Sequence, residues 1–272
     1  MAEPPRAQDP TSPSSHEELL DALARTDDRD AALESWLAWQ AEAGLDWAVS
    51  ETPLDRFAQA AAPLDLPPAP DAGEHPARRA RTLDELRAAL EAFEGCALKT
   101  TATQLVFADG TPGAPVMVIG EAPGAEEDRA GVPFIGRAGR LLDRMLASIG
   151  LDRSAVYIAN VVPWRPPGNR TPSAQETAAC LPFLKRQIEL AAPQVILCVG
   201  GPSSQNVLGL KEGIMRTRGV WRAFESHGFA APAMATLHPA YLLRSPQHKN
   251  LVWRDLRAVR AELDRRAIKR KF

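Results

Sequence analysis

From Thr82 onward, short apolar runs alternate with amphipathic segments, and this alternation restricts the fold more than any other feature of the chain. The apolar runs are residues 116–120, 156–162, 195–200 and 233–237. Helical spacing fills the segments between and after them, over residues 141–150, 173–190 and 251–266. Apolar strands separated by helices are typical of a parallel sheet that is covered on both faces. The sequence therefore predicts an α/β fold with three α/β/α layers around a central, mainly parallel four-stranded sheet.

The chain before residue 81 differs from the rest in charge and composition. Residues 1–75 contain 16 acidic and 4 basic residues, whereas residues 76–272 contain 18 acidic and 28 basic residues. Residues 52–80 hold six prolines, as a linker does, and residues 16–44 have loosely helical apolar spacing. We expect an acidic, partly helical and Pro-rich N-terminal extension over residues 1–80 and a basic α/β domain over residues 81–272.

Composition excludes several classes of protein. No apolar run reaches the roughly 18 residues that a membrane span needs, and the N-terminus lacks the basic and apolar segments of a signal peptide. Three cysteines are too few for a disulfide framework. We expect a monomeric cytoplasmic protein without a membrane partner. The net charge of −2 would argue against a nucleic-acid partner if it were spread evenly along the chain. Because residues 76–272 have an excess of basic residues, this part of the chain can still bind nucleic acid.

The loop after the first apolar run is the first candidate site, because ligands in parallel sheets bind beyond the carboxyl ends of the strands. Residues 120–128 read GEAPGAEED. They lack the Gly-Lys-Ser/Thr end of a phosphate-binding loop and the glycine spacing of a dinucleotide-binding turn, which disfavours a nucleotide cofactor. The two glycines fit a tight strand-to-helix turn as well as a ligand site.

Other residues near the strand ends have both a structural and a functional interpretation. Phe134, between glycines, is either a buried anchor or a platform on which a base stacks. Asn160 lies in an apolar strand, where a buried amide needs hydrogen-bond partners. Residues 163–170 (PWRPPGNR) form either a stiff loop with a structural role or a loop that places hydrogen-bond donors against a phosphate backbone. His238 precedes a proline, two leucines and an arginine, a combination that suits a loop entering a base stack.

Taken together, these segments resemble the uracil-DNA glycosylase superfamily, and within it the type-4 branch. The resemblance covers about residues 90–260 in unbroken order. Its motifs are GEAPGAEED (120–128), GVPFIGRAG (131–139), VYIANVVPWRPPGNR (156–170), ETAACLPFLKRQIELAAP (176–193) and HPAYLLR (238–244). Each motif is weak alone, whereas five in order with compatible spacing are specific. The resemblance implies an enzyme that flips uracil out of DNA and hydrolyses its bond to the sugar.

The resemblance implies three catalytic residues, Glu121, Asn160 and His238. Asn160 would read the edge of uracil through its amide, and His238 would donate a hydrogen bond to the anion that develops at uracil O2. Ala122 stands at the usual water-activating position, which therefore has no aspartate. Glu121 and the backbone carbonyls of its turn are the two candidates for placing the attacking water.

The resemblance also implies contacts to the substrate and to DNA. Phe134 would stack on the base, and Glu127 would form a wall against the methyl group of thymine. The implied substrate-binding residues are Ala122, Gly124, Glu127, Phe134 and Asn169. The implied DNA-binding residues are Arg165, Arg170, Leu243 and Arg244, of which the last two would enter the gap left by the flipped nucleotide.

The chain departs from the type-4 pattern at the metal site. Type-4 enzymes typically hold a four-iron, four-sulfur cluster through four cysteines. Cys96 and Cys180 match two of these positions, whereas Phe93 and Trp164 occupy the other two. Two thiolates do not make a four-cysteine site. We therefore expect no metal and no cofactor, with the two aromatic side chains packing as a small core beside free thiols.

The sequence thus predicts a monofunctional uracil-DNA glycosylase whose basic domain binds uracil-containing DNA and leaves an abasic site. An alternative of another class is a non-catalytic module that binds damaged DNA and recruits repair or replication partners through acidic residues 1–80. A third is a related glycosylase that prefers another deaminated base. The presence of Asn160, Phe134 and His238 favours the enzyme.

Overall fold

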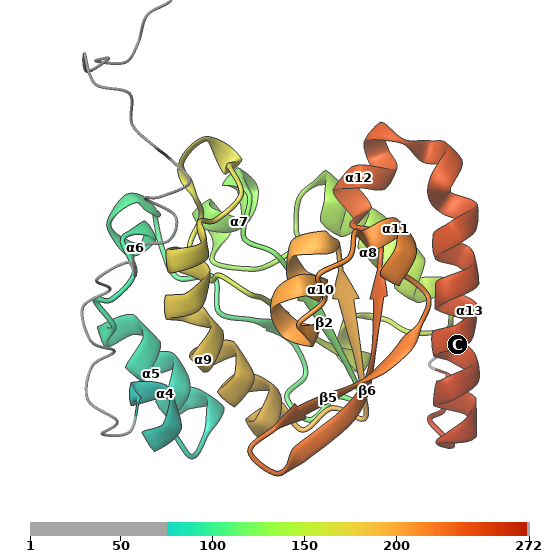
Figure 1. Ribbon diagram of the computed structural model, residues 1–272, viewed down its shortest axis with the longest axis horizontal. Coiled ribbons are helices and arrows are strands. Elements are labelled where there is room, and N and C mark those ends of the chain that lie inside the picture. Colours follow the sequence, from blue (N-terminus) through green and yellow to red (C-terminus); the bar gives the residue numbers. More distant parts are fainter. Residues whose placement is uncertain (1–74, 271–272) are drawn as a thin grey trace, which may run out of the picture. The chain divides into compact units, whose positions relative to one another are not determined.

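The computed structural model describes residues 75–270, which form a sheet with helices on both faces (Figure 1). These residues belong to one compact unit, Ala69–Phe272. The helix expected over residues 16–44 lies outside the described residues, and so does the expected linker up to residue 74. Helix α4 (Pro76–Arg79) precedes the expected domain start at residue 81 and packs against α9 (Ala174–Ala191).

Six strands form one mixed sheet in the order β1-β3-β2-β4-β6-β5. Their bounds are β1 (Asp109–Gly110), β2 (Val116–Gly120), β3 (Val156–Asn160), β4 (Val195–Val199), β5 (Trp221–Ser226) and β6 (Phe229–Thr236). Strand β2 pairs in parallel with β3 and β4, and β4 pairs in parallel with β6. The edge strands β1 and β5 are antiparallel to their neighbours. The mainly parallel sheet is confirmed, whereas the expected number of four strands is corrected to six.

The two edge strands lack the apolar runs that identify buried strands. Strand β1 has only two residues, and β5 has an alternating sequence with exposed Arg222 and Glu225. His227 and Gly228 join β5 to β6, with φ angles of 42° and 86°. Two consecutive left-handed residues are characteristic of the type I′ turn of a two-residue hairpin.

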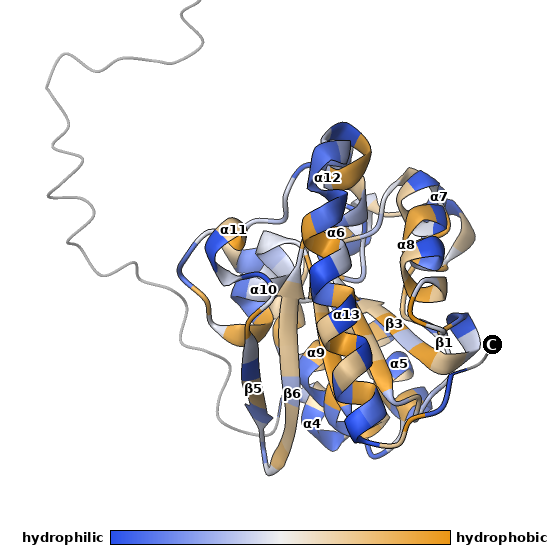
Figure 2. Ribbon diagram, turned by 90° about the vertical axis from the view of Figure 1, so that its right-hand side faces the viewer, coloured by the Kyte–Doolittle hydropathy of each residue, from blue (hydrophilic) through white to orange (hydrophobic). Residues whose placement is uncertain are grey.

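Alternate residues of the central strands supply two separate hydrophobic cores. Met117 and Ile119 of β2 face the core that contains α5 (Leu83–Ala92) and α9, whereas Val116 and Val118 face the core that contains α8 (Arg137–Ala147) and α13 (Lys249–Arg265). Figure 2 looks onto α8 and α13, and both helices show hydrophilic and hydrophobic stretches, as amphipathic helices do. The expected three-layer arrangement is confirmed.

The remaining helices are short and lie in the connections. They are α6 (Leu98–Thr101), α7 (Ala125–Ala130), η1 (Arg153–Ala155), η2 (Pro167–Asn169), α10 (Gly201–Leu208), α11 (Ile214–Thr217), α12 (Pro239–Arg244) and η3 (Pro246–His248). Helices α7, α10 and α12 begin within a few residues of the ends of β2, β4 and β6, so their N-terminal ends gather at the carboxyl edge of the sheet. No described helix is long and apolar enough to span a membrane.

Candidate active site

A pocket of about 630 Å³ lies at the carboxyl edge of the parallel strands and is lined by the loops that follow β2, β3, β4 and β6. This is the position at which α/β sheets bind ligands. All three residues predicted to be catalytic line the pocket, as do all five predicted to bind the substrate. Of the four residues predicted to contact DNA, Arg170 and Arg244 line it, whereas Arg165 and Leu243 do not.

Asn160 is the last residue of β3 and presents an unpaired amide oxygen. The residue is 5% exposed, and its Oδ1 atom has no hydrogen-bond partner among the described residues. Gly120 is its partner in β2, and a Cβ atom on that residue would lie 2.4 Å from Oδ1, so only glycine fits there. A buried acceptor without a donor is costly. This atom therefore indicates a donor supplied by a ligand.

Phe134 lies beside Asn160 at the same end of β2. A Cβ atom on Gly120 would also lie 2.6 Å from Cζ of Phe134, so the absence of a side chain at position 120 makes room for both residues. The Phe134 ring is buried, and its centroid lies 5.5 Å from that of His238 with a 33° angle between the planes. Phe134 has φ 55°, a left-handed value that is uncommon for a residue with a bulky side chain.

His238 caps the N-terminus of α12, and this contact determines which ring nitrogen carries the proton. The backbone N–H of Ala240 donates to His238 Nδ1 at 3.1 Å, so the neutral ring has its proton on Nε2. Burial lowers the pKa of His238 to about 4, with a smaller contribution in the same direction from Arg244 and an opposing one from Glu127. At neutral pH the ring is therefore an uncharged donor.

Glu121 is the carboxylate nearest to the end of β2, and it lies between two cavities. It lines the main pocket together with Thr171, and both residues also line a second cavity of about 180 Å³. Burial raises the pKa of Glu121, whereas a hydrogen bond with Thr171 acts in the opposite direction. The neighbouring Ala122 has no polar side chain, so Glu121 is the ionisable group of this turn.

Glu127 lines the pocket and also fixes the loop that carries Phe134. Its Oε1 atom accepts hydrogen bonds from the backbone N–H groups of Ile135 at 3.1 Å and Gly136 at 2.9 Å. A Cβ atom on Gly124 would lie 2.7 Å from the other carboxylate oxygen. These contacts restrict the carboxylate to one position, as a rigid wall of a pocket requires.

The arginines of the loop after β3 are engaged with partners inside the protein. Arg165 donates to Oδ1 of Asn169 at 2.8 Å and pairs with buried Asp128 at 4.0 Å. Arg170 forms two hydrogen bonds with Glu176, at 2.8 and 2.6 Å. Both arginines therefore stabilise this loop in the structure, which adds a role to the predicted contact with DNA.

The residues expected to enter the base stack lie on α12. Leu243 is 39% exposed, which is unusual for a leucine of this domain, and it lies outside the pocket lining. Arg244 follows it and lines the pocket. The two side chains thus stand at the rim, next to His238 at the start of the same short helix.

Several lining residues were missed by sequence reasoning. Gly200, Gly201 and Pro202 follow β4 at the start of α10, so the strand-end rule could have identified them. Gly200 has φ 103°, and a Cβ atom on it would lie 3.2 Å from Cβ of His238. Ile214 and Met215 of α11 also line the pocket, and no sequence signal marks them.

The four positions that correspond to the cluster ligands of type-4 enzymes do not fit a four-iron cluster. Cys96, Trp164 and Cys180 are buried in the hydrophobic core, and the two thiols share a hydrogen bond. Phe93 packs edge-on against Phe183 with ring centroids 4.9 Å apart. In the part of the chain that the structure describes, no three His, Cys, Asp or Glu side chains are arranged to hold a metal.

Comparisons with known proteins point to one family. Residues 107–257 match the profile of the uracil DNA glycosylase superfamily. The chain is 38% identical over 182 residues to a type-4 uracil-DNA glycosylase of Archaeoglobus fulgidus, which covers 65% of this chain and 92% of the relative. It is 40% identical over 169 residues to one of Thermotoga maritima, covering 61% and 86%. A third, of Sulfurisphaera tokodaii, is 36% identical over 187 residues, covering 66% and 84%.

Proposed function

The chain belongs to the uracil-DNA glycosylase superfamily, and from this we propose that its pocket accepts a uracil flipped out of DNA and hydrolyses the N-glycosidic bond. The relatives place the chain in the class of DNA repair glycosylases. The choice of uracil and the role of each residue rest on the chemistry of the pocket.

The unpaired Oδ1 atom of Asn160 is the observation that carries the proposal. Uracil has an N–H donor at N3 beside an oxygen acceptor at O4, and the side-chain amide of asparagine offers the complementary acceptor and donor. Cytosine has an acceptor at N3 and an amino group at C4, so it would oppose the same amide. The buried position of Asn160 makes such a mismatch costly.

His238 supports the departure of the base. When the bond between C1′ and N1 breaks, its electron pair stays on uracil and the negative charge reaches O2. The neutral ring of His238 donates its Nε2 proton in a hydrogen bond to O2. A donor placed in this way contributes on the order of 10²–10³ in rate. Water then bonds to C1′, and its released proton balances the charge.

Glu121 is the group that we assign to the attacking water. Its carboxylate lines the pocket and also borders the second cavity, so it remains accessible to water when a base fills the main pocket. The half-buried carboxylate would accept a hydrogen bond from water and so orient the water oxygen toward the sugar. Asn169, from the loop after β3, also lines the pocket, and we assign it to substrate binding.

Phe134 and Glu127 determine which bases fit. Phe134 stacks on the pyrimidine ring, as aromatic side chains do in pockets that receive flipped bases. Glu127 is fixed by two backbone N–H groups, so a methyl group at C5 of thymine would meet a carboxylate that cannot move aside. The backbone of Ala122 and Gly124 completes the turn beside the sugar.

Leu243 and Arg244 are assigned to the DNA duplex. Leu243 is exposed at the pocket rim, where an apolar wedge can fill the space that the flipped nucleotide leaves. We assign phosphate contacts to three arginines, Arg165, Arg170 and Arg244. To make them, Arg165 and Arg170 exchange or share their carboxylate partners, which are Asp128 and Glu176. The excess of basic residues over residues 76–272 supports such binding.

We also propose that the enzyme works without an iron–sulfur cluster. Two of the four ligand positions are aromatic, and the two remaining cysteines contact each other within a hydrophobic core. Packing of Phe93 against Phe183 of α9 then joins the N-terminal part of the described chain to the helix layer. No catalytic step depends on a metal in this scheme.

A uracil-containing oligonucleotide tests the function. The full chain is incubated with end-labelled DNA that carries one uracil, and alkali then cleaves any abasic site. Strand scission at the uracil is the expected result, and an Asn160→Asp variant is the control. Absence of scission with retained binding to the same DNA would instead favour a non-catalytic module. Scission only at hypoxanthine or xanthine would show that the substrate is another deaminated base.

A further inference from the structure

The backbone at Phe134 is in a conformation that its own side chain disfavours. Its φ angle of 55° lies in the left-handed region, which residues other than glycine, asparagine and aspartate rarely adopt. Gly139 allows the backbone of Phe134 to pass close to α8, because a Cβ atom at position 139 would lie 1.6 Å from the carbonyl oxygen of Phe134. Such a conformation persists only when surrounding contacts enforce it.

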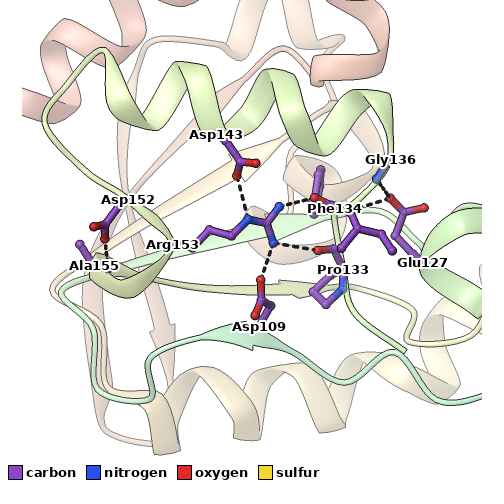
Figure 3. Close-up of polar contacts among 10 residues, drawn as sticks. Asp109, Glu127, Pro133, Phe134, Gly136, Asp143, Asp152, Arg153 and Ala155 are labelled. Carbon is purple, nitrogen blue, oxygen red and sulfur yellow. Dashed lines mark hydrogen bonds and ion pairs between the residues drawn. The ribbon is translucent and has the colours of Figure 1, made fainter. Parts of the chain in front are cut away.

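Arg153 supplies these contacts from outside the pocket. Its guanidinium donates to the carbonyl oxygen of Phe134 and, at 3.3 Å, to that of Pro133 (Figure 3). These two carbonyls belong to the peptide groups on either side of the Phe134 Cα atom. Both peptide planes that define the φ and ψ angles of Phe134 are therefore bound by one side chain.

The second of these peptide groups is held from both ends. Its carbonyl accepts from Arg153, and its N–H, which belongs to Ile135, donates to Glu127 at 3.1 Å. Figure 3 shows Arg153 and Glu127 approaching the loop from different sides. Rotation of this peptide would break hydrogen bonds to both residues.

Arg153 is itself fixed by two carboxylates. It pairs with Asp143 of α8 at 2.8 Å and with Asp109 of β1 (Figure 3). Burial acts to lower the pKa of Arg153, but the hydrogen bonds and the charges of the two carboxylates together raise it. The five N–H groups of a planar guanidinium can donate to two carbonyls and two carboxylates at once. The ammonium group of lysine has only three donors and no planar arrangement, so it could not make all of these contacts.

We propose that Arg153 is a positioning residue that orients the Phe134 ring in the base pocket. Arg153 is absent from the pocket lining, so its influence on excision passes through residues 133–135. The ring that it places lies 5.5 Å from the ring of His238. This inference rests on the stacking role of Phe134 in the proposed function.

A matched variant separates positioning from general stabilisation. Arg260 donates to the backbone carbonyls of Ile149 and Ile268 and pairs with Asp264, as Arg153 does with its own carbonyls and carboxylates. It is buried, whereas Arg153 is half-buried, and it lies on α13 away from the pocket lining. We expect Arg153→Met to lower single-turnover excision of uracil by about tenfold or more, because small displacements of positioning groups are costly. Arg260→Met should lower the thermal unfolding temperature but change excision less than about twofold. Equal losses of excision in both folded variants would overturn the proposal.

A double-mutant cycle tests whether Arg153 acts through Phe134. Excision is measured for Phe134→Ala, for Arg153→Met and for the double variant at a temperature where all are folded. If Arg153 acts only by placing the ring, the double variant is no slower than Phe134→Ala alone. Losses that multiply would show that Arg153 acts by another route and would contradict the proposal.

A structural readout separates this inference from the proposed function. In a crystal structure of Arg153→Met, we expect the loop over residues 133–135 to shift and Phe134 to leave its φ value near 55°. An unchanged loop would contradict the positioning role even if the wild-type enzyme excises uracil. A wild-type protein that releases no uracil, together with a shifted loop in the variant, would contradict only the proposed function.

Discussion

The rings of Phe134 and His238 face each other in the pocket, with centroids 5.5 Å apart and planes inclined by 33°. They come from different elements: Phe134 precedes α8, whereas His238 begins α12. Helices α8 and α12 are in contact, and this contact brings the two loops together. One side of the pocket thus combines an aromatic ring with an uncharged hydrogen-bond donor, the two groups that the proposed function assigns to stacking on the base and to its developing negative charge.

Replacing His238 by alanine tests the donor. We expect single-turnover excision of uracil to fall by roughly two or more decades, because the hydrogen bond forms most strongly in the transition state. Binding of uracil-containing DNA should change little, since the contact contributes less in the ground state. A decrease in rate of less than about tenfold would show that His238 has no such role.

Replacing Asn160 by aspartate tests the recognition of the base. Aspartate keeps an oxygen at the position of Oδ1 but loses the donor at Nδ2, so the contact with uracil O4 disappears. We expect uracil excision to fall strongly while the protein remains folded, as circular dichroism can verify. An unchanged rate of uracil excision would refute the edge-reading role of Asn160.

The low pKa of His238 predicts a pH dependence of stability. Its pKa is about 4 in the folded protein, against about 6.5 for an ordinary histidine. Between these values the unfolded chain binds more protons than the folded chain. The contribution of His238 to stability is therefore complete above about pH 6.5 and is lost as the pH falls toward 4. Chemical denaturation of the wild type and of His238→Gln between pH 4 and 8 measures this.

The free energies of unfolding of the wild type and of His238→Gln should depend differently on pH. The free energy of unfolding of the wild type should decline more steeply than that of the variant as the pH falls from 6.5 to 4. Parallel curves over this range would show that His238 titrates normally and is not held as a neutral donor.

The cluster question can be decided by iron analysis and by restoring the ligands. We expect protein purified without oxygen to contain no stoichiometric iron and to fold fully. The double variant Phe93→Cys, Trp164→Cys supplies four cysteines at the family positions, and a brown protein with iron and sulfide would show that the aromatic residues exclude the cluster. About four irons in the wild-type chain would contradict the proposal.

Much of the fold was predictable because buried parallel strands have continuous apolar sequences. The run at residues 116–120 coincides with β2, and the other three central runs differ from their strands mainly at the ends. The edge strand β5 was not predicted, because its sequence lacks a continuous apolar run and, with exposed Arg222 and Glu225, resembles a surface loop. Its short turn at His227 and Gly228 was the available signal.

The candidate site was predictable where it follows a strand end and not where it depends on tertiary contacts. Asn160 and His238 lie at strand ends and line the same pocket. Arg153 precedes β3 and looks like any surface arginine in the sequence. Its relation to Phe134 depends on α8 and β1, which supply Asp143 and Asp109. Likewise, the partners of Arg165 and Arg170 become visible only when the loop is folded.

The release of free uracil is the most direct measurement of the central proposal. DNA with a single uracil is mixed with excess full-length protein, and the small-molecule fraction is analysed by mass spectrometry. We expect one free uracil per uracil-containing strand from the wild type and far less from Asn160→Asp and His238→Ala. Release of no uracil by a folded wild-type protein that binds the DNA would contradict the proposed function.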